Sequence, residues 1–260
     1  MADLSPSDLT YALLPVLLAI ALSAWQRLGL EGPLAVAAVR SLLQLAIVGY
    51  VLEAVFVLPW PPLVGVVAVG ITAIAAALIR YRLAPGVGSL LPTTFGALLA
   101  SVGLTFCYGM LTLARSTHWA NPQIVLPLLG VLLGNAVSCG TIAGERAIAG
   151  LERDELDIET HLSLGATPKQ ATARLRRAAI RAGVLPSLSQ MTLAGLLTVP
   201  SLTVGQLLGG VAPLTAISYQ IIILFLQAFA SLGATVAIVD GILQQAFTAR
   251  AQLSPPRWRG

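Results

Sequence analysis

The sequence predicts an all-α, polytopic membrane helix bundle. Of its 260 residues, 57% are hydrophobic and only 10% are charged, and the mean hydropathy is +0.86. So few polar side chains cannot cover the surface of a water-soluble globule. The apolar runs are long and lack the ten-residue alternation of a transmembrane barrel, and an open sheet could not pair its backbone groups in lipid. Helices that cross the bilayer are therefore the expected elements.

About seven apolar runs are long enough to cross roughly 30 Å of hydrocarbon at 1.5 Å per residue. The first has no basic region before it and no clear small-residue cleavage site, so we expect a retained helix rather than a signal peptide. Because no linker or soluble domain interrupts the runs, residues 1–260 are expected to form one membrane domain. The runs lie at 9–29, 33–58, 62–80, 88–113, 122–144, 183–208 and 213–245.

The basic residues predict the orientation, because short loops rich in Lys and Arg remain in the cytoplasm. With the N-terminus outside and the C-terminus in the cytoplasm, the outer loops hold only Arg115, and Arg40 lies inside a helix. The net charge of +4 then reflects topology, and no nucleic-acid partner is expected. All other basic residues fall on the inner side: Arg27, Arg80, Arg82, Arg146, Arg153, Lys169, Arg174, Arg176, Arg177, Arg181, Arg250, Arg257 and Arg259.

A polar block at 144–182 separates the fifth and sixth runs, and this orientation makes it a cytoplasmic loop. Its first part places Ile148, Leu151, Ile158 and Leu162 at spacings of 3, 7 and 4 among acids and arginines, which predicts an amphipathic helix. Gly165 is expected to end that helix, since glycine readily takes the left-handed conformation.

A second helix is expected to begin immediately after this glycine. Thr167 is a good N-cap, Pro168 suits the first helical position, and Gln170 stands three residues after the cap, so that Thr167 and Gln170 can form a capping box. Such a cap stabilises a helix start by about 1 kcal/mol. The alternative is a solvated connector, but two delimited helices followed by the basic residues 174–181 favour an element with a fixed orientation.

Polar residues at membrane depth are the candidates for a transport pathway, because a charge there costs about 2.5–3.5 kcal/mol on insertion scales. Arg40 and Gln44 lie one turn apart, and Glu53 lies further out on the same run. The alternative for both charges is snorkelling to the membrane surface. Uncharged candidates, of which Gln206 and Gln220 are preferred, could instead make interhelical hydrogen bonds. They are Asn135, Gln206, Tyr219 and Gln220, with Gln190 and Gln227 as further polar groups.

The sixth run contains residues that break or kink a helix. Pro200 removes a backbone donor, and Gly205, Gly209 and Gly210 permit turns or close approach before Pro213 starts the last run. A gate and a simple extracellular hairpin explain these residues equally well.

Several motifs, taken together, resemble a known family. The stretch "LSLGATPKQA" at 162–171, followed by "AAIRAGVLPSL", resembles the coupling loop of ABC-transporter permeases. The chain is similar in particular to the Fet-type iron-export ABC permeases, which are related to plant aluminium-tolerance half-transporters. The similarity includes the segments "RSLLQLAIVGYVLEAVF" at 40–56, "LPLLGVLLGNAV" at 126–137 and "GLLTVPSLTVGQLLGGVAPLTAISYQI" at 195–221.

The resemblance implies a permease of the inner (plasma) membrane, with a second copy of itself and a separate cytosolic ATPase as partners. ATP and Mg would bind to that ATPase, and this chain would bind no cofactor; Lys169 is its only lysine and no glycine-rich phosphate loop precedes it. The implied ATPase-coupling residues are Leu164, Gly165, Ala166, Thr167, Pro168, Lys169 and Gln170.

The chain departs from the family pattern after Pro200. Leu202 and Thr203 replace two methionines, and Ala212 replaces an aspartate before Pro213; Ser201 and Val204 also differ from the expected residues. Thioethers and a carboxylate would have been the natural ligands for a metal ion, so the metal ligands are unknown. His118 and His161 have no second histidine at helical spacing and are expected in surface or hydrogen-bonding roles.

Two other classes of function are open alternatives. One is a secondary transporter driven by an ion gradient, with Arg40 and Glu53 as coupling charges, although no inverted repeat supports it. The other is a membrane subunit that only anchors or regulates an ATPase. No nucleophile, base and orienting acid converge in the sequence, so the chain is not expected to be an enzyme itself.

Overall fold

The computed structural model describes residues 6–57, 61–83, 90–113, 122–248 and 252–253, and these residues are almost entirely helical. They form two compact units, Met1–Trp60 and Pro61–Gly260. The helical backbone satisfies its own hydrogen bonds, as a chain in lipid requires. The chain is therefore an all-α protein, as the sequence predicts.

The first unit is a hairpin of α1 (Pro6–Trp25) and α2 (Glu31–Val57). Its turn is held by the buried hydroxyl of Ser23, which accepts a hydrogen bond from the Leu30 backbone N–H and donates one to Glu31 Oε1, both at 3.1 Å. Apart from such residues, the described side chains of both helices are mostly exposed and apolar. A surface of this kind suits lipid or apolar protein neighbours.

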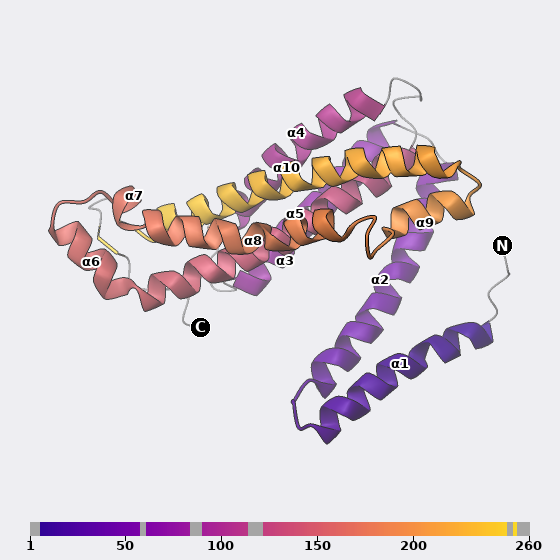
Figure 1. Ribbon diagram of the computed structural model, residues 1–260, viewed down its shortest axis with the longest axis horizontal. Coiled ribbons are helices and arrows are strands. Elements are labelled where there is room, and N and C mark those ends of the chain that lie inside the picture. Colours follow the sequence, from indigo (N-terminus) through magenta and orange to yellow (C-terminus); the bar gives the residue numbers. More distant parts are fainter. Residues whose placement is uncertain (1–5, 58–60, 84–89, 114–121, 249–251, 254–260) are drawn as a thin grey trace. The chain divides into compact units, whose positions relative to one another are not determined.

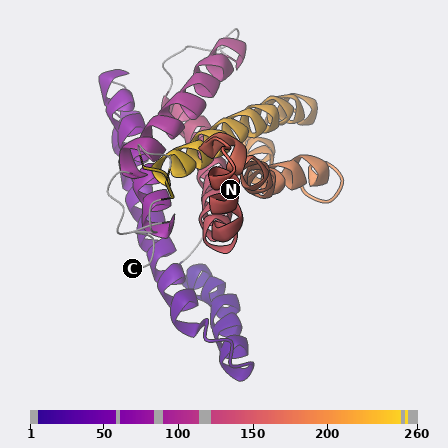
Figure 2. The ribbon, with the colours of Figure 1, turned by 90° about the vertical axis from the view of Figure 1, so that its left-hand side faces the viewer.

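The second unit is built around the long helix α10 (Pro213–Gln245), which lies between α4 (Leu90–Leu113) and α8 (Ala173–Leu193) in both Figure 1 and Figure 2. The helix α5 (Pro122–Arg153) packs against α10, α8 and α3 (Pro61–Leu83). Three short helices complete the unit: α6 (Glu155–Ser163), α7 (Pro168–Ala171) and α9 (Ser201–Leu208).

Small residues form the centre of this unit. Ala136 and Ala143 on α5 and Ala230 and Ala234 on α10 have no exposed surface. Small side chains let helix backbones approach closely, which is how helices associate where no water drives them together. Branched residues such as Ile238 fill the remaining space with full burial.

The predicted number of spans is wrong. Among the described residues, five helices are long and apolar enough to cross a membrane, and the apolar segment Leu13–Trp25 of α1 is shorter. Five or six candidate spans therefore replace the seven expected. The five are Glu31–Phe56, Leu63–Leu83, Leu90–Thr112, Gln123–Arg153 and Pro213–Gln245.

The error lies in the run 183–208, which is not one helix. Its first half belongs to α8, which begins at Ala173 among the arginines and ends at Leu193. Gly195 then takes a left-handed conformation with φ 83°, which an L side chain rarely adopts, and Pro200 caps α9 without offering a backbone N–H. Glycine and proline thus cut the apolar run into a helix end, a turn and a short helix.

The polar block differs from its prediction in where the helices break. The fifth run was expected to end at 144, but α5 continues to Arg153, because Ala, Glu, Arg and Leu are good helix formers that carry the helix past the apolar region. The expected single amphipathic helix is divided at Asp154 into the end of α5 and α6. Its apolar face is confirmed, since Leu151 and Ile158 are buried and Ile148 and Leu162 pack against the core.

Candidate functional site

A stripe of polar residues runs along α10. Gln220, Gln227, Ser231 and Thr235 follow each other at spacings of 7, 4 and 4, which places them on one helix face. Ser231 and Thr235 have no exposed surface, and Gln220 is 8% exposed. Because this face packs against α5, α8 and α9, the stripe forms the polar side of an otherwise apolar helix interface.

A cavity of about 610 Å³ opens beside the N-terminal half of this stripe. Its walls come from α5, α8, α9 and α10 and from the turn before α9. Two of these helices, α5 and α10, are candidate spans. The described lining residues are Gly130, Val131, Gly134, Asn135, Ser138, Pro186, Gln190, Thr198, Pro200, Ser201, Leu202, Gln220, Ile223, Leu224 and Gln227.

Asn135 joins three helices through hydrogen bonds at the base of this cavity. Its Nδ2 donates to Ser231 Oγ on α10 at 2.9 Å and lies 3.3 Å from Ser187 Oγ on α8. All three side chains are at least 92% buried, since their exposed fractions are 8%, 0% and 2%. Interhelical hydrogen bonds of this kind are worth about 0.6–2 kcal/mol in membrane proteins. The network therefore fixes the spacing of α5, α8 and α10.

A second hydrogen bond fixes the short helix α9. Thr203 Oγ1 donates to Gln220 Oε1 at 3.0 Å, and both side chains are buried. The turn before α9 contains Pro200 and a left-handed Gly195, which interrupt the helix. The hydrogen bond joins α9 to α10 beyond this break. Leu202 on α9 also packs against the core.

Gln190 and Gln227 differ from Asn135 and Gln220 in their hydrogen bonding. Their carboxamides make no hydrogen bond within the described part of the chain, although both line the cavity. Gln190 is exposed and Gln227 is half-buried. Each carboxamide offers one acceptor oxygen and two donor hydrogens to a molecule inside the cavity.

Below the cavity the three helices meet at Gly183. A Cβ atom at this position would lie 2.5 Å from Ala143 Cβ, 2.7 Å from the Cys139 carbonyl oxygen and 3.0 Å from Thr235 Cγ2. Distances this short leave no room for a methyl group, and one of the neighbours is backbone. Only glycine therefore fits at this crossing of α5, α8 and α10.

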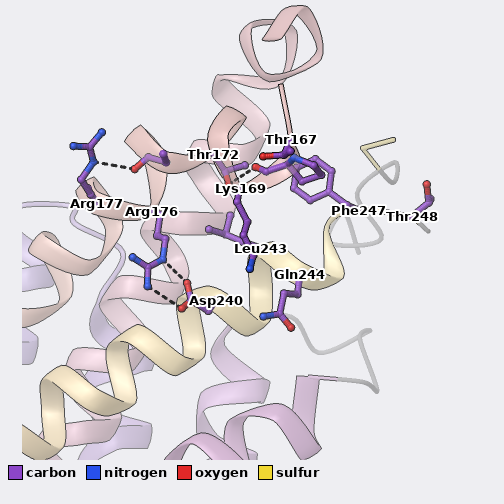
Figure 3. A pocket seen from close by; sticks show the side chains of 12 residues that line it. Thr167, Lys169, Thr172, Arg176, Arg177, Asp240, Leu243, Gln244, Phe247 and Thr248 are labelled. Atoms are coloured by element: carbon purple, nitrogen blue, oxygen red, sulfur yellow. Dashed lines mark hydrogen bonds and ion pairs between the residues drawn. The ribbon is translucent and has the colours of Figure 1, made fainter. Parts of the chain in front are cut away.

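Beyond this junction lies a second hollow, a groove of about 900 Å³ between α7, the start of α8 and the end of α10. Figure 3 shows Arg176 turned toward Asp240, with Nε donating to Oδ1 and Nη2 donating to Oδ2 at 2.8 Å. These bonds to the carboxylate raise the pKa of the Arg176 guanidinium above its ordinary value. In the same view Lys169 extends from α7 toward Gln244, whereas Arg177 bonds to the carbonyl of Ala173. We call this hollow the charged groove.

The turn that begins α7 has the predicted cap. Gln170 N–H donates to Thr167 Oγ1 and Thr167 N–H donates to Gln170 Oε1, which completes the capping box, with Pro168 at the first position. Gly165 has φ 90° and ends the preceding helix, as expected. Thr172 then bonds to the carbonyl of Pro168 and leads directly into α8. The exposed Leu164 (82%) lies beside this turn.

The other predicted pathway residues are divided between the two units. Asn135 and Gln220 line the cavity, but Gln206 and Tyr219 are half-buried and do not line it. Arg40, Gln44 and Glu53 lie on α2 in the first unit, where their side chains are exposed. The expected break near Pro200 is present: Gly205 lies within α9, Gly209 caps its end, and Gly210 is left-handed with φ 85°.

Sequence reasoning missed the ion pair between Arg176 and Asp240 and the partners Ser187, Ser231 and Thr203. No local signal links Arg176 to a residue 64 positions away. The stripe on α10, however, was visible as polar residues at helical spacing. His161 is exposed, with Nδ1 2.7 Å from the carbonyl oxygen of Asp157, as expected for a surface role, and His118 lies outside the described residues.

Across the described ranges, no group of three His, Cys, Asp or Glu side chains is arranged to hold a metal ion. The cavity therefore offers carboxamides and hydroxyls, and the charged groove offers one ion pair together with the basic side chains of Lys169 and Arg177. The former can hydrogen-bond a solute, and the latter can receive an acidic or polar partner surface.

The comparisons with known proteins place these features in a family. Residues 6–247 match the family described as Uncharacterised protein family (UPF0014). The chain is 41% identical over 237 residues to the UPF0014 membrane protein slr1647 of Synechocystis sp., covering 90% of this chain and 91% of that protein. It is 32% identical over 240 residues to the probable iron export permease protein FetB of Escherichia coli, covering 90% of each.

A plant relative is similar over a large part of the chain. The chain is 33% identical over 214 residues to the UPF0014 membrane protein STAR2 of Oryza sativa subsp. japonica, covering 80% of this chain and 72% of that protein. No solved structure matches the chain. The expected resemblance to iron-export permeases is confirmed by these relatives.

Proposed function

The chain belongs to the UPF0014 family of multi-pass membrane proteins, and on that basis we propose that it is the membrane-spanning permease of a transporter that exports iron. The relative FetB is a probable iron export permease, and it aligns over nine tenths of both chains. ATP would be hydrolysed by a separate cytosolic ATPase, with its own Mg, as the resemblance to ABC permeases implies. A second copy of this chain would complete the membrane part.

The observation that carries the proposal is the polar cavity between α5, α8, α9 and α10. Gln227 lies half-buried on the candidate span α10 without a hydrogen-bond partner in the described part of the chain, and an apolar helix interface has no reason to keep it, because a desolvated amide costs about 1–3 kcal/mol. A path for a polar solute supplies that reason. Gln190 and Gln227 are the groups available to cargo, and Asn135 and Gln220 hold the walls.

The turn from Leu164 to Gln170 supports an ATPase-docking role at the other hollow. Its capping box fixes the first turn of α7, and Thr172 joins it to α8 without a flexible linker. A rigid turn of this kind can transmit a push from a docked partner. With the C-terminus in the cytoplasm, as the basic residues predict, this turn faces the ATPase.

Arg176 and Asp240 would transmit this movement to the cavity. They clamp the start of α8 to the end of α10, and the same two helices carry Gln190 and Gln227 into the cavity wall. Closure of the ATPase on α7 would move α8 and α10 together at the clamp and change their spacing at the cavity. The break around Pro200, Gly205, Gly209 and Gly210 would act as the hinge of α9.

The proposal is tested by purifying the tagged protein from its native membrane in mild detergent and identifying what remains bound. We expect an ATPase with Walker motifs at one copy per copy of this chain. Replacing Gly165 and Ala166 by leucine should remove it without preventing membrane insertion, whereas the same change at Gly96, where a Cβ would meet open space, should not. If no ATPase co-purifies under conditions that preserve known ABC complexes, the proposal fails.

Transport is measured with the purified complex in proteoliposomes. ATP-dependent movement of iron, lost in the Gly165 and Ala166 variant, would support a coupled permease. An ATPase that remains bound with no flux of any metal would favour a subunit that only anchors or regulates it.

A further inference from the structure

We propose that the polar cavity binds a metal ion that keeps its shell of bound water. The lining forms hydrogen bonds to these waters and does not coordinate the metal directly. The inference rests on the proposed function and specifies the cargo as a hydrated divalent cation. It follows from the chemistry of the lining, the state of each polar group, the size of the cavity and its charge.

The lining offers poor direct ligands. None of the described residues around the cavity is a carboxylate, thiol, thioether or imidazole; its polar side chains are carboxamides and hydroxyls. Direct sites for iron and similar metals use Cys, Met, His or carboxylate ligands. The nearest thiol, Cys139, is buried outside the lining and lies 4.0 Å from Asn135 Oδ1.

The carboxamide oxygens are not all free to bind a metal. Gln220 Oε1 already accepts the hydroxyl of Thr203, and Asn135 Oδ1 accepts the thiol of Cys139 while its Nδ2 donates to Ser187 and Ser231. Gln190 and Gln227 are the two lining carboxamides that make no hydrogen bond within the described part of the chain, and they belong to different helices, α8 and α10. Two separate carboxamides are too few for a direct octahedral site but can hydrogen-bond opposite sides of a hydrated ion.

The cavity is large enough for the shell. Six waters in an octahedral shell occupy roughly 180 Å³ at about 30 Å³ each, well below the 610 Å³ of the cavity. A bare ion would leave most of this space unfilled and its charge without a ligand.

The absence of charged residues from the described lining supports the same conclusion. The cost of moving an ion from water into a medium of low dielectric falls as the radius of the charged body increases. A hydrated ion is several times larger than a bare one, and metal-bound waters are strong hydrogen-bond donors. An uncharged lining of amides and hydroxyls is therefore suited to the hydrated form, and it also binds loosely enough to release it.

Hexaamminecobalt(III) tests this directly, because its ammine shell does not exchange and presents only N–H donors to a protein. Proteoliposomes that carry the permease and its ATPase, with ATP sites facing outward, would receive Fe²⁺ under anaerobic conditions together with this complex. We expect it to compete with iron for transport. In the double variant Gln190→Leu and Gln227→Leu, the concentration needed for half-inhibition should rise about tenfold, which corresponds to about 1.4 kcal/mol of lost hydrogen bonding.

Gln206→Leu is the matched control. This glutamine lies on α9 but does not line the cavity, so inhibition by hexaamminecobalt(III) should be unchanged. Normal ATP-dependent iron flux that the complex does not inhibit would overturn the outer-shell inference and leave the proposed function standing. Absence of iron flux in the unmodified complex would overturn both. Half-inhibition of the double variant at the same concentration as the unmodified complex would place recognition elsewhere and also overturn the inference.

Discussion

The two hollows of the second unit are both lined by α8 and α10, but one has a neutral lining and the other a charged one. The cavity beside Gln190 and Gln227 has no charged residue among its described lining, whereas the groove beside Arg176 and Asp240 is lined by charged side chains. Gln220 and Asp240 are 20 residues apart on α10, about 30 Å along the helix axis. Asp240 lies near the C-terminal end of α10, and the neutral Gln227 lies near the middle of that helix.

The difference follows from the cost of burying charge. At a helix end an ion pair can keep part of its hydration, and the side chains of Arg176 and Asp240 are 39% and 34% exposed. Within the span the same groups would have to lose that water, which costs several kcal/mol per ion even after relaxation. Under the proposed function, α8 and α10 would form a single mechanical element with a charged control end and a neutral solute end.

The largest expected effect comes from breaking the junction between the two hollows. Gly183→Leu should prevent α5, α8 and α10 from packing, since even a Cβ would lie within 3.0 Å of three atoms, one of them a backbone oxygen. Gly183→Ala should lower the free energy of unfolding by about 1–3 kcal/mol, despite the better helix propensity of alanine. Thermal unfolding in detergent measures both.

Gly96 provides the control for this substitution. A Cβ there meets nothing within 4 Å, so Gly96→Ala should leave the unfolding temperature unchanged or raise it. Equal effects at Gly183 and Gly96 would show that the three helices do not meet tightly at this point.

The next largest effect is expected at the base of the cavity. Asn135→Leu should destabilise the protein by about 1–2 kcal/mol, because it leaves the buried hydroxyls of Ser187 and Ser231 without their partner. Ser138→Ala is the comparison, since that exposed hydroxyl bonds only to the carbonyl of Gly134 on its own helix. If Ser138→Ala destabilised the protein as much as Asn135→Leu, the network would have no special role in stability.

A smaller effect should come from the clamp at the charged end. Arg176→Ala and Asp240→Ala should each destabilise the protein slightly, and a double-mutant cycle should give a coupling energy of about 1 kcal/mol, as for a partly exposed pair with two hydrogen bonds. Exchanging the charges, Arg176→Asp with Asp240→Arg, should recover part of the loss. Strictly additive single changes would mean that the pair does not join α8 to α10.

The smallest change in stability is expected at the cap. Thr167→Ala removes the acceptor for Gln170 N–H and should cost less than about 1 kcal/mol of overall stability, because the turn is exposed. Stimulation of the partner ATPase, by contrast, should fall strongly. Thr167→Ser keeps the hydroxyl and should behave like the unmodified protein; if it loses stimulation equally, the capping hydrogen bond is not the reason.

Much of the fold could be predicted because hydrophobicity and capping are local properties. Four of the apolar runs coincide closely with long helices, α5 extends past the end of the fifth run, and the capping box at Thr167 and the left-handed Gly165 have the expected geometry. The run 183–208 was misread because its composition is apolar throughout, whereas backbone conformation at Gly195 and Pro200 decides where the helix stops.

The site could be predicted only in part. Asn135 and Gln220 stood out as polar residues in apolar runs, and both line the cavity. The clamp between Arg176 and Asp240 depends on how α8 packs against α10, which no local pattern reveals. Arg40, Gln44 and Glu53 lie on α2 of the first unit, and their role in the pathway stays a prediction.

The central claim is that the charged groove controls the neutral cavity, and cysteine labelling tests it most directly. A single cysteine at Gln227, with Cys107 and Cys139 replaced by alanine, would be labelled with a water-soluble thiol reagent in the purified complex with its ATPase. The account predicts a several-fold change in labelling rate between the nucleotide-free and ATP-trapped states, and no change when Arg176 and Asp240 are both alanine. The same rate in every nucleotide state of the complex with Arg176 and Asp240 intact would contradict it.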